Sequence, residues 1–123
     1  MGLKIGAEYA IPFAIPQVEL LAGTAIDLVA PADGFINEIQ AVATTTITTG
    51  GAITVQTKGT TTVDGLNATF ANAAAKGTVR SGRATKGHAS RWVNKGDRIS
   101  ILPAAAFDGA GAVNGQLILS TGN

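Results

Sequence analysis

Cysteine is absent from this chain, and histidine occurs once, at His88. Without thiols there is no disulfide or thiolate chemistry, and a single imidazole does not favour a zinc site. The serines nearest to His88, Ser81 and Ser90, stand in no nucleophile-elbow pattern. The eight acidic residues are scattered, without the spacing of a carboxylate dyad or a calcium loop. We therefore expect no catalytic residue, no metal and no cofactor.

Aromatic and charged residues are also scarce. The chain has one Trp, one Tyr and four Phe, and charged residues make up 14% of it, against about 25% in a typical soluble domain. Two carboxylates could still serve a glycosidase, but sugar sites usually have aromatic platforms, and few aromatics are available here. The surface must be built mainly from Thr, Ser, Asn, Gly and Ala. Such a surface can meet another protein without a large cost for desolvating charge.

No stretch approaches the roughly 20 apolar residues of a membrane helix. The first residues, Met1 to Lys4, lack the charged start and the apolar run of a signal peptide. We therefore expect a soluble protein that stays where it is made, or in an assembly built there, and that has no membrane partner.

Strand patterns dominate the chain. Residues Phe35–Val42 have apolar groups on both parities, which predicts a strand covered at least partly on both faces. The β-branched run Thr44–Thr49 continues this strand. Gly50-Gly51 then predicts a turn, and Ala52–Thr57 alternates cleanly, so that the whole segment predicts a β-hairpin.

The rest of the chain repeats this pattern of short strands and turns. Turns are expected at Lys58-Gly59 and Asp64-Gly65, and Pro103 should end a strand. Turns recur about every eight to twelve residues, which predicts an all-β sandwich or barrel with little helix. The further strands expected are Thr60–Val63, Asn67–Phe70, Gly77–Arg80, Arg98–Leu102 and Val113–Ser120.

Residues 1–16 differ from the remainder, so we divide the chain into an extended N-terminal arm (1–16) and a single β-sandwich domain (17–123). Pro12 and Pro16 exclude a central strand and leave an extended arm or an edge strand. Alternation places four apolar side chains on one side of this segment: Tyr9, Ile11, Phe13 and Ile15. These side chains need an apolar surface, which is either the chain's own sandwich or a neighbouring subunit.

The basic residues are concentrated in one segment. Seven of the nine Lys and Arg residues lie between Lys76 and Arg98, with Asp97 as the only acid there, so this segment has a formal charge of +6. The rest of the chain, with two bases and seven acids, has −5. This predicts a basic rim for an acidic partner, unless the bases pair across the sandwich with Glu19, Asp27, Glu38 or Asp64. Nucleic acid is not favoured, because Trp92 is the one aromatic residue among the bases.

Four short motifs follow one another in the second half of the chain: Lys76-Gly77-Thr78-Val79, Gly87-His88-Ala89-Ser90, Lys95-Gly96-Asp97 before an apolar strand, and Pro103-Ala104-Ala105-Ala106-Phe107. They lie in the stretch AKGTVRSGRATKGHASRWVNKGDRISILPAAAFDGAGAVNGQLILS, which follows APADGFINEIQAVATTTITTGGAITV. In this order the motifs resemble the head decoration (cement) proteins of tailed bacteriophages. The resemblance covers residues 30–123, about three quarters of the chain.

The resemblance implies a jelly-roll-like β-sandwich of short antiparallel strands on the outer surface of a phage capsid. Such a protein assembles as a homodimer or homotrimer and clamps neighbouring subunits of the major capsid protein against the pressure of packaged DNA. The N-terminal arm would then reach a neighbour or the capsid. The candidate interface residues, chosen by charge and by aromatic or apolar character, are Tyr9, Ile11, Phe13, Ile15, Arg80, Arg83, Lys86, Arg91 and Trp92.

Two other classes of protein remain open. One is a different virion β-module, such as a head-fibre base or a receptor-binding tip, although the chain has no heptads or internal repeat for a stalk. The other is a carbohydrate- or nucleic-acid-binding sandwich, which the scarcity of aromatic residues does not favour.

Overall fold

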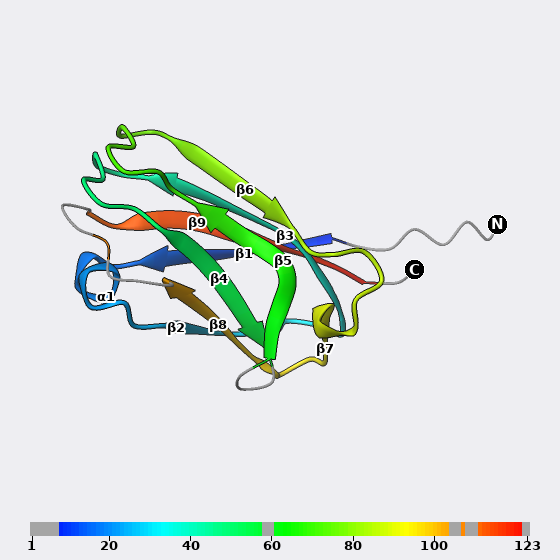
Figure 1. Ribbon diagram of the computed structural model, residues 1–123. Coiled ribbons are helices and arrows are strands. Elements are labelled where there is room, and N and C mark those ends of the chain that lie inside the picture. The colour runs from blue at the N-terminus through cyan, green and yellow to red at the C-terminus, as the bar shows by residue number, and fades with distance from the viewer. Residues whose placement is uncertain (1–7, 58–60, 104–106, 108–110, 122–123) are drawn as a thin grey trace.

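The strands of the chain are divided between two antiparallel sheets that pack face to face (Figure 1). The computed structural model describes residues 8–57, 61–103, 107 and 111–121. Sheet A contains, in spatial order, β1 (Glu8–Ile15), β9 (Val113–Ser120), β3 (Gly34–Ala43) and β6 (Val79–Arg83), with β7 (Trp92–Val93) beside the start of β3. Sheet B contains β2 (Ile26–Val29), β8 (Arg98–Pro103), β4 (Ala52–Thr57) and β5 (Thr61–Thr69).

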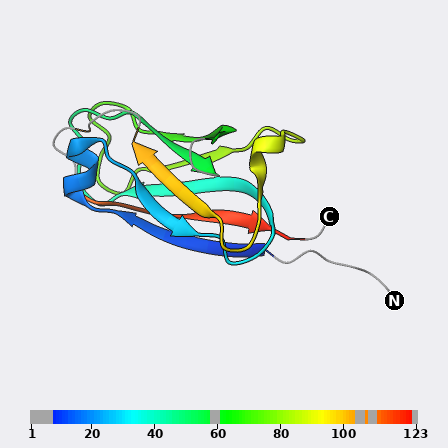
Figure 2. The same cartoon turned by 90° about the horizontal axis from the view of Figure 1, so that it is seen from below.

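Most connections between strands cross from one sheet to the other, and β4 and β5 form a hairpin within sheet B. Sheet A has five strands, with the short β7 beside the path of the other four, and sheet B has four. The orders β1-β9-β3-β6 and β2-β8-β4-β5, with β1 beside β9, are those of a jelly roll. The predicted all-β, jelly-roll-like sandwich is therefore confirmed. The described helices are α1 (Gln17–Ala22) and the 3₁₀ turn η1 (Ala89–Arg91). Figure 2 shows α1 at the end of the sandwich opposite to the start of β1.

The core lies between the sheets and is filled by one parity of each long strand. Sheet A supplies Ile36, Ile39 and Leu117, and sheet B supplies Ile53 and Ile101, all fully buried. At one end, the rings of Phe70 and Phe107 pack edge to face with their centroids 6.4 Å apart. Burying such side chains stabilises the fold by about 1.5–3 kcal/mol each.

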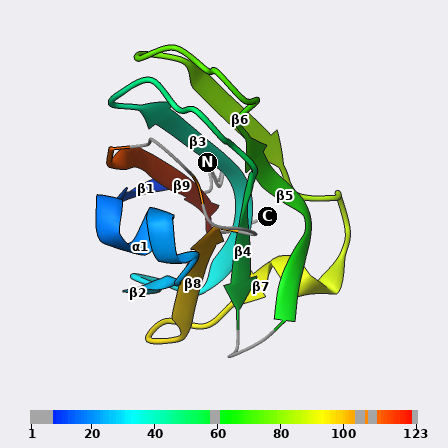
Figure 3. The same cartoon turned by 60° about the vertical axis from the view of Figure 1, so that its left-hand side comes forward.

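The two sheets are joined along one side, where β5 and β6 lie side by side (Figure 3). A methyl group on Gly82 of β6 would lie 1.8 Å from the carbonyl oxygen of Asn67 in β5, so only glycine allows this approach. Just beyond β6, the N–H of Thr85 donates to the carbonyl oxygen of Asp64, at 2.8 Å. On the other side of the sandwich, α1 connects β1 to β2, and its Leu20 is fully buried.

The segment predicted as an N-terminal arm is an edge strand of the sandwich from Glu8 onward. β1 pairs with β9 along its whole length, and Ile11, Phe13 and Ile15 are buried in the core. Phe13 lies opposite Gly115 in the register, and a methyl group there would come within 2.6 Å of the ring. The division between an arm (1–16) and a domain (17–123) is therefore corrected: of the two alternatives, the chain's own sandwich covers these side chains.

The apolar groups on both parities of β3 result partly from a β-bulge. The pairing of β3 with β9 shifts between Ile36 and Glu38, so Ile36 faces the core and so does Ile39, three residues later. A bulge inserts one residue and exchanges the two faces of the strand beyond it. The outward residues Phe35 and Val42 are half-buried, in agreement with the partial cover predicted for both faces.

The predicted hairpin between Phe35 and Thr57 is wrong. β3 belongs to sheet A and β4 to sheet B, and residues 44–51 cross between the sheets instead of turning within one. Thr44–Thr49 is not a strand; its Ile47 is buried and donates its N–H to the carbonyl oxygen of Ala74, at 2.8 Å. The crossing lets β4 cover the core face of β3, which a flat hairpin would leave exposed.

The predicted turn at Asp64-Gly65 is also wrong, because β5 passes through it. Thr54 pairs with Asn67 while Gln56 pairs with Thr62, so β5 has extra residues between them. Gly65 has a φ of +77° and absorbs them as a bulge. By contrast, Val113–Ser120 is a strand as predicted, and Pro103 is the last residue of β8. The expected turn at Lys58-Gly59 lies outside the described residues.

Candidate interaction surface

The outward face of sheet A, called here the sheet A face, is built from three rows that cross all four long strands. One row runs through Val79, Val42, Asn114 and Ala14, the next through Ser81, Gln40, Gln116 and Pro12, and the third through Arg83, Glu38, Ile118 and Ala10. The rows combine small apolar side chains with neutral amides. Val79 is the most exposed of the larger apolar residues on this face, at 61%. The first two rows contain no charged residue, and charged residues are also depleted at the core of protein interfaces.

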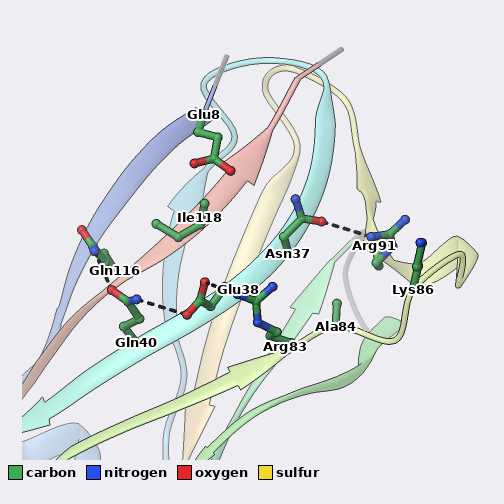
Figure 4. A pocket seen from close by; sticks show the side chains of 10 residues that line it. All are labelled: Glu8, Asn37, Glu38, Gln40, Arg83, Ala84, Lys86, Arg91, Gln116 and Ile118. Carbon is green, nitrogen blue, oxygen red and sulfur yellow. Dashed lines mark hydrogen bonds and ion pairs between the residues drawn. The ribbon is translucent and has the colours of Figure 1, made fainter. Parts of the chain in front are cut away.

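A chain of hydrogen bonds fixes the amides of the sheet A face (Figure 4). The Nε2 of Gln116 donates to the Oε1 of Gln40, at 2.7 Å. The Nε2 of Gln40 in turn donates to the carboxylate of Glu38, at 3.1 Å, and Arg83 lies 3.8 Å from the same carboxylate. This network joins β9, β3 and β6, and it holds the side chains in set orientations before any partner binds.

A second polar chain crosses the same face toward the start of β1. Arg91 donates to the Oδ1 of Asn37, at 3.1 Å, and Asn37 donates through its amide nitrogen to the hydroxyl of Ser120. The Ser120 hydroxyl lies 3.5 Å from the carboxylate of Glu8. Because Asn37 is the bulged residue of β3, the bulge is what brings its amide into line with these groups.

The two polar chains border a groove of about 630 Å³ on the sheet A face. Figure 4 shows the carboxylates of Glu8 and Glu38 on the strands and Lys86 and Arg91 on the connection that follows β6. Arg83 at the end of β6 completes this basic side. The groove therefore offers donors and acceptors of both charges to a polar segment of a partner, and its lining includes no aromatic side chain.

The Arg91 side chain packs on Phe35, which in turn packs against Trp92. Its guanidinium lies over the ring of Phe35, 4.8 Å from the centroid, and Phe35 packs edge to face against Trp92 at 5.0 Å. The indole N–H of Trp92 donates to the Oδ1 of Asn94, at 3.0 Å. A cation over an aromatic face is stabilised by about 0.5–2 kcal/mol, which keeps the Arg91 side chain ordered.

The outward face of sheet B, called here the sheet B face, is chemically different. Its central positions are Thr54, Gln56, Ser100 and Leu102, which are half-buried or buried. Asp27 accepts a hydrogen bond from the hydroxyl of Ser100, at 2.6 Å. Within the described ranges, no ion pair occurs on this face. The sheet B face is therefore a polar surface with few charges.

The candidate interface residues do not form one cluster. Arg83, Lys86 and Arg91 line the groove, whereas Arg80 is exposed on the opposite parity of β6. Trp92 supports Arg91 through Phe35 and does not line the groove. Tyr9 is 43% exposed on β1, beyond the groove. Three of the candidates must be corrected, because the chain's own core uses them: Ile11, Phe13 and Ile15.

Sequence reasoning missed the neutral residues of this surface, namely Asn37, Gln40, Asn114 and Gln116. A search for charged and aromatic residues passes over amides, which are common on any strand. The signal available was the alternation within Val113–Ser120, which places Gln116 opposite to the buried Leu117 and Leu119. Its partner Gln40 is 76 residues away, and only the pairing of β3 with β9 brings the two amides together.

His88 and Ser90 come together in the structure as a helix cap. The Nδ1 of His88 lies 2.8 Å from the hydroxyl of Ser90 and accepts the N–H of Ser90 at 3.2 Å, at the start of η1. The Ser90 hydroxyl is buried and also accepts the N–H of Asp64, at 3.0 Å. Both groups are therefore occupied in fixing the β6–β7 connection against β5.

No group of three or more His, Cys, Asp or Glu side chains in the described part of the chain could hold a metal ion. Neither α1 nor η1, the helices of the described ranges, has the length and hydropathy to span a bilayer. A scan against protein-family models finds no match to this chain, and neither does a search of curated proteins.

Proposed function

We propose that this protein is a structural component of a virion: a capsid decoration (cement) protein that binds the outside of a tailed-phage head. In this proposal the sheet A face contacts the major capsid protein and stabilises contacts between its subunits. The protein also associates with further copies of itself, as the decorated lattice requires. No catalytic step is involved, and no cofactor is needed.

The observation behind this proposal is the composition of the sheet A face. Small apolar residues such as Ala10, Pro12 and Ala14 allow close approach, and the amides of Gln40 and Gln116 are already oriented by hydrogen bonds. Ordered side chains lose little conformational entropy on binding, and the two rows that begin at Val79 and Ser81 contain no charged residue that would have to be desolvated. Such a face favours a broad contact with another folded protein over the binding of a small substrate.

The fold and the sequence resemblance point the same way. Jelly rolls are frequent among viral capsid domains, although a fold alone does not determine function. The resembling motifs lie at structurally defining places: Gly87-His88-Ala89-Ser90 leads into η1, and Lys95-Gly96-Asp97 forms the turn before β8, with Gly96 at a φ of +90°. They support a shared fold more directly than a shared binding site.

The proposal is tested with heads assembled from the major capsid protein that the same genome encodes. The purified chain should co-sediment with expanded heads at a fixed ratio of copies, and it should raise the temperature at which the heads open. A chain that stays in the supernatant and leaves the opening temperature unchanged would contradict the proposal.

Two glutamines provide matched variants for locating the contact. Gln116→Arg places a bulky charge in the centre of the sheet A face, and Gln56→Arg makes the same change at a half-buried position of the sheet B face. We expect Gln116→Arg to weaken binding to heads at least about tenfold, because the interface would bury an unpaired charge. Gln56→Arg should bind like the unmodified chain, and the reverse result would place the contact on sheet B.

A further inference from the structure

Opposite edges of the sandwich have opposite charges. The edge formed by β1, α1 and β2 contains three acids and no base among its described residues: Glu8, Glu19 and Asp27. The edge formed by β6, the connection that precedes it and the residues that follow it as far as η1 contains four bases: Lys76, Arg80, Arg83 and Lys86. β1 and β6 are the two outer strands of sheet A, and Figure 3 shows β6 on the side away from α1 and β2.

These charges are scarcely neutralised within one molecule. In the described ranges, Arg83 is the only base within 4.0 Å of a carboxylate, that of Glu38. Asp27 instead accepts the hydroxyl of Ser100, and Asp64 accepts that of Thr85, at 2.5 Å. The alternative in which the basic segment pairs across the sandwich therefore accounts for one of its seven bases.

The two edges are also too far apart to attract each other within the fold. Three strand spacings separate β6 from β1, which is about 14 Å. At physiological salt the Debye length is about 8 Å, so surface charges at this distance are largely screened. Between two molecules, however, the edges can approach to contact distance.

We infer that the basic β6 edge of one copy docks against the acidic β1–α1–β2 edge of the next copy. Each molecule has both complementary edges, one with four bases and one with three acids. The partner of each edge is therefore a second copy of this chain. Such a contact is head to tail, so it uses two different surfaces and continues as a ring or as a row. The inference deepens the self-association in the proposed function. Glu8, Arg83 and Lys86, which line the groove, take part in this contact, and the rest of the sheet A face is left for the capsid.

The experiment measures self-association by sedimentation velocity for the unmodified chain and two charge-reversed variants. Glu8→Lys/Glu19→Lys reverses the acidic edge, and Arg80→Glu/Lys86→Glu reverses the basic edge without touching the Arg83–Glu38 pair. Each variant alone should associate at least about tenfold more weakly, because like charges then face each other. A 1:1 mixture of the two variants should recover association, since reversed edges match each other.

The control is Lys95→Glu/Arg98→Glu, which changes the net charge by the same amount as the basic-edge variant. Its two residues lie in the turn before β8 and at the first position of β8. It should associate like the unmodified chain, and association of the unmodified chain should weaken with added salt. Three results would overturn the inference: an unmodified chain that stays at the 12.3 kDa monomer mass, an assembly that stops at a dimer, or a mixture that does not recover.

Head binding by the same variants separates this inference from the proposed function. If the unmodified chain associates but does not bind heads, the capsid role fails and the head-to-tail contact stands. If heads bind the chain but it does not associate, the contact fails alone. A third outcome combines two results: the unmodified chain does not self-associate, and only the basic-edge variant loses head binding. The partner of the basic edge would then be an acidic capsid surface, and the inference would be overturned.

Discussion

The outward faces of the two sheets differ although both cover the same core. The sheet A face has a groove, an ion pair and two chains of hydrogen bonds that link neighbouring strands. The sheet B face has Thr54, Gln56 and Ser100 at its centre, with few charges. In both sheets the inward parity supplies buried apolar residues to this core.

This difference separates the residues that specify the fold from those that specify recognition. Alternation requires apolar residues on one parity of each strand and leaves the other parity free. On sheet B the central outward positions are occupied by Thr54, Gln56, Ser100 and Leu102, without an ion pair among the described residues. On sheet A the outward parity is used for an ordered set of longer polar side chains. We therefore expect changes on the inward parity to alter stability, and changes on the sheet A face to alter binding.

The largest loss of stability is expected from a substitution that forces the two sheets apart where β5 and β6 lie side by side. Gly82→Ala would place a methyl group 1.8 Å from the carbonyl oxygen of Asn67, so β5 and β6 would have to move apart. We expect it to lower the free energy of unfolding by about 3 kcal/mol, near the upper end for overpacked sites. Gly51→Ala is the control, because its methyl group would only make an ordinary contact with the Phe107 ring, at 3.5 Å. Urea unfolding of both variants measures the difference, and equal stabilities would contradict this expectation.

The edge strands of the two sheets provide the next comparison. Phe13→Ala in β1 should lower the free energy of unfolding by about 3–4 kcal/mol, because it leaves a cavity beneath a side chain that is 5% exposed. Val29→Ala in β2 should change it by no more than about 0.5 kcal/mol, since Val29 is 67% exposed. Deletion of residues 1–16 removes β1 and should abolish the cooperative unfolding transition. A deleted chain that still unfolds cooperatively would restore the interpretation of this segment as a separate arm.

The smallest effect is expected from the polar groups that distinguish the two faces. Glu38→Gln removes the exposed ion pair with Arg83, and Asp27→Asn keeps an acceptor for Ser100 on sheet B. Each should change the free energy of unfolding by about 0.5 kcal/mol or less, because exposed pairs contribute little. Thermal unfolding at low and moderate salt measures both. A loss of several kcal/mol in Glu38→Gln would mean that the network on sheet A supports the fold itself.

Much of the fold could be predicted from the sequence, because a strand such as Val113–Ser120 records its own buried face in its alternation. The failures have two physical causes. A bulge, as in β3 or at Gly65 in β5, changes parity without any composition that marks it. Residues 44–51 could form a hairpin or cross to the other sheet. They cross because β4 pairs with β5 and β8, and this pairing cannot be read from the local sequence.

The candidate surface was predicted less well than the fold. Arg83, Lys86 and Arg91 were found because charge is visible in a sequence, and the structure places them on one groove. The amides of Gln40 and Gln116 were not found, because their meeting depends on the register between β3 and β9. Alternation shows that one face of β1 must be covered, but it does not show which surface covers it. For this reason the interface candidates included Ile11, Phe13 and Ile15.

The pairing of the first strand with the last has a consequence for the timing of synthesis. Glu8 and Ser120 are 112 residues apart, so β1 emerges from the ribosome long before its partner β9 exists. Until then Ile11, Phe13 and Ile15 have no strand beside them, and contacts of such long sequence separation form slowly. Sheet A can be completed only after β9 has left the ribosome. A nascent chain stalled before residue 113 should therefore be the species that aggregates or binds chaperones.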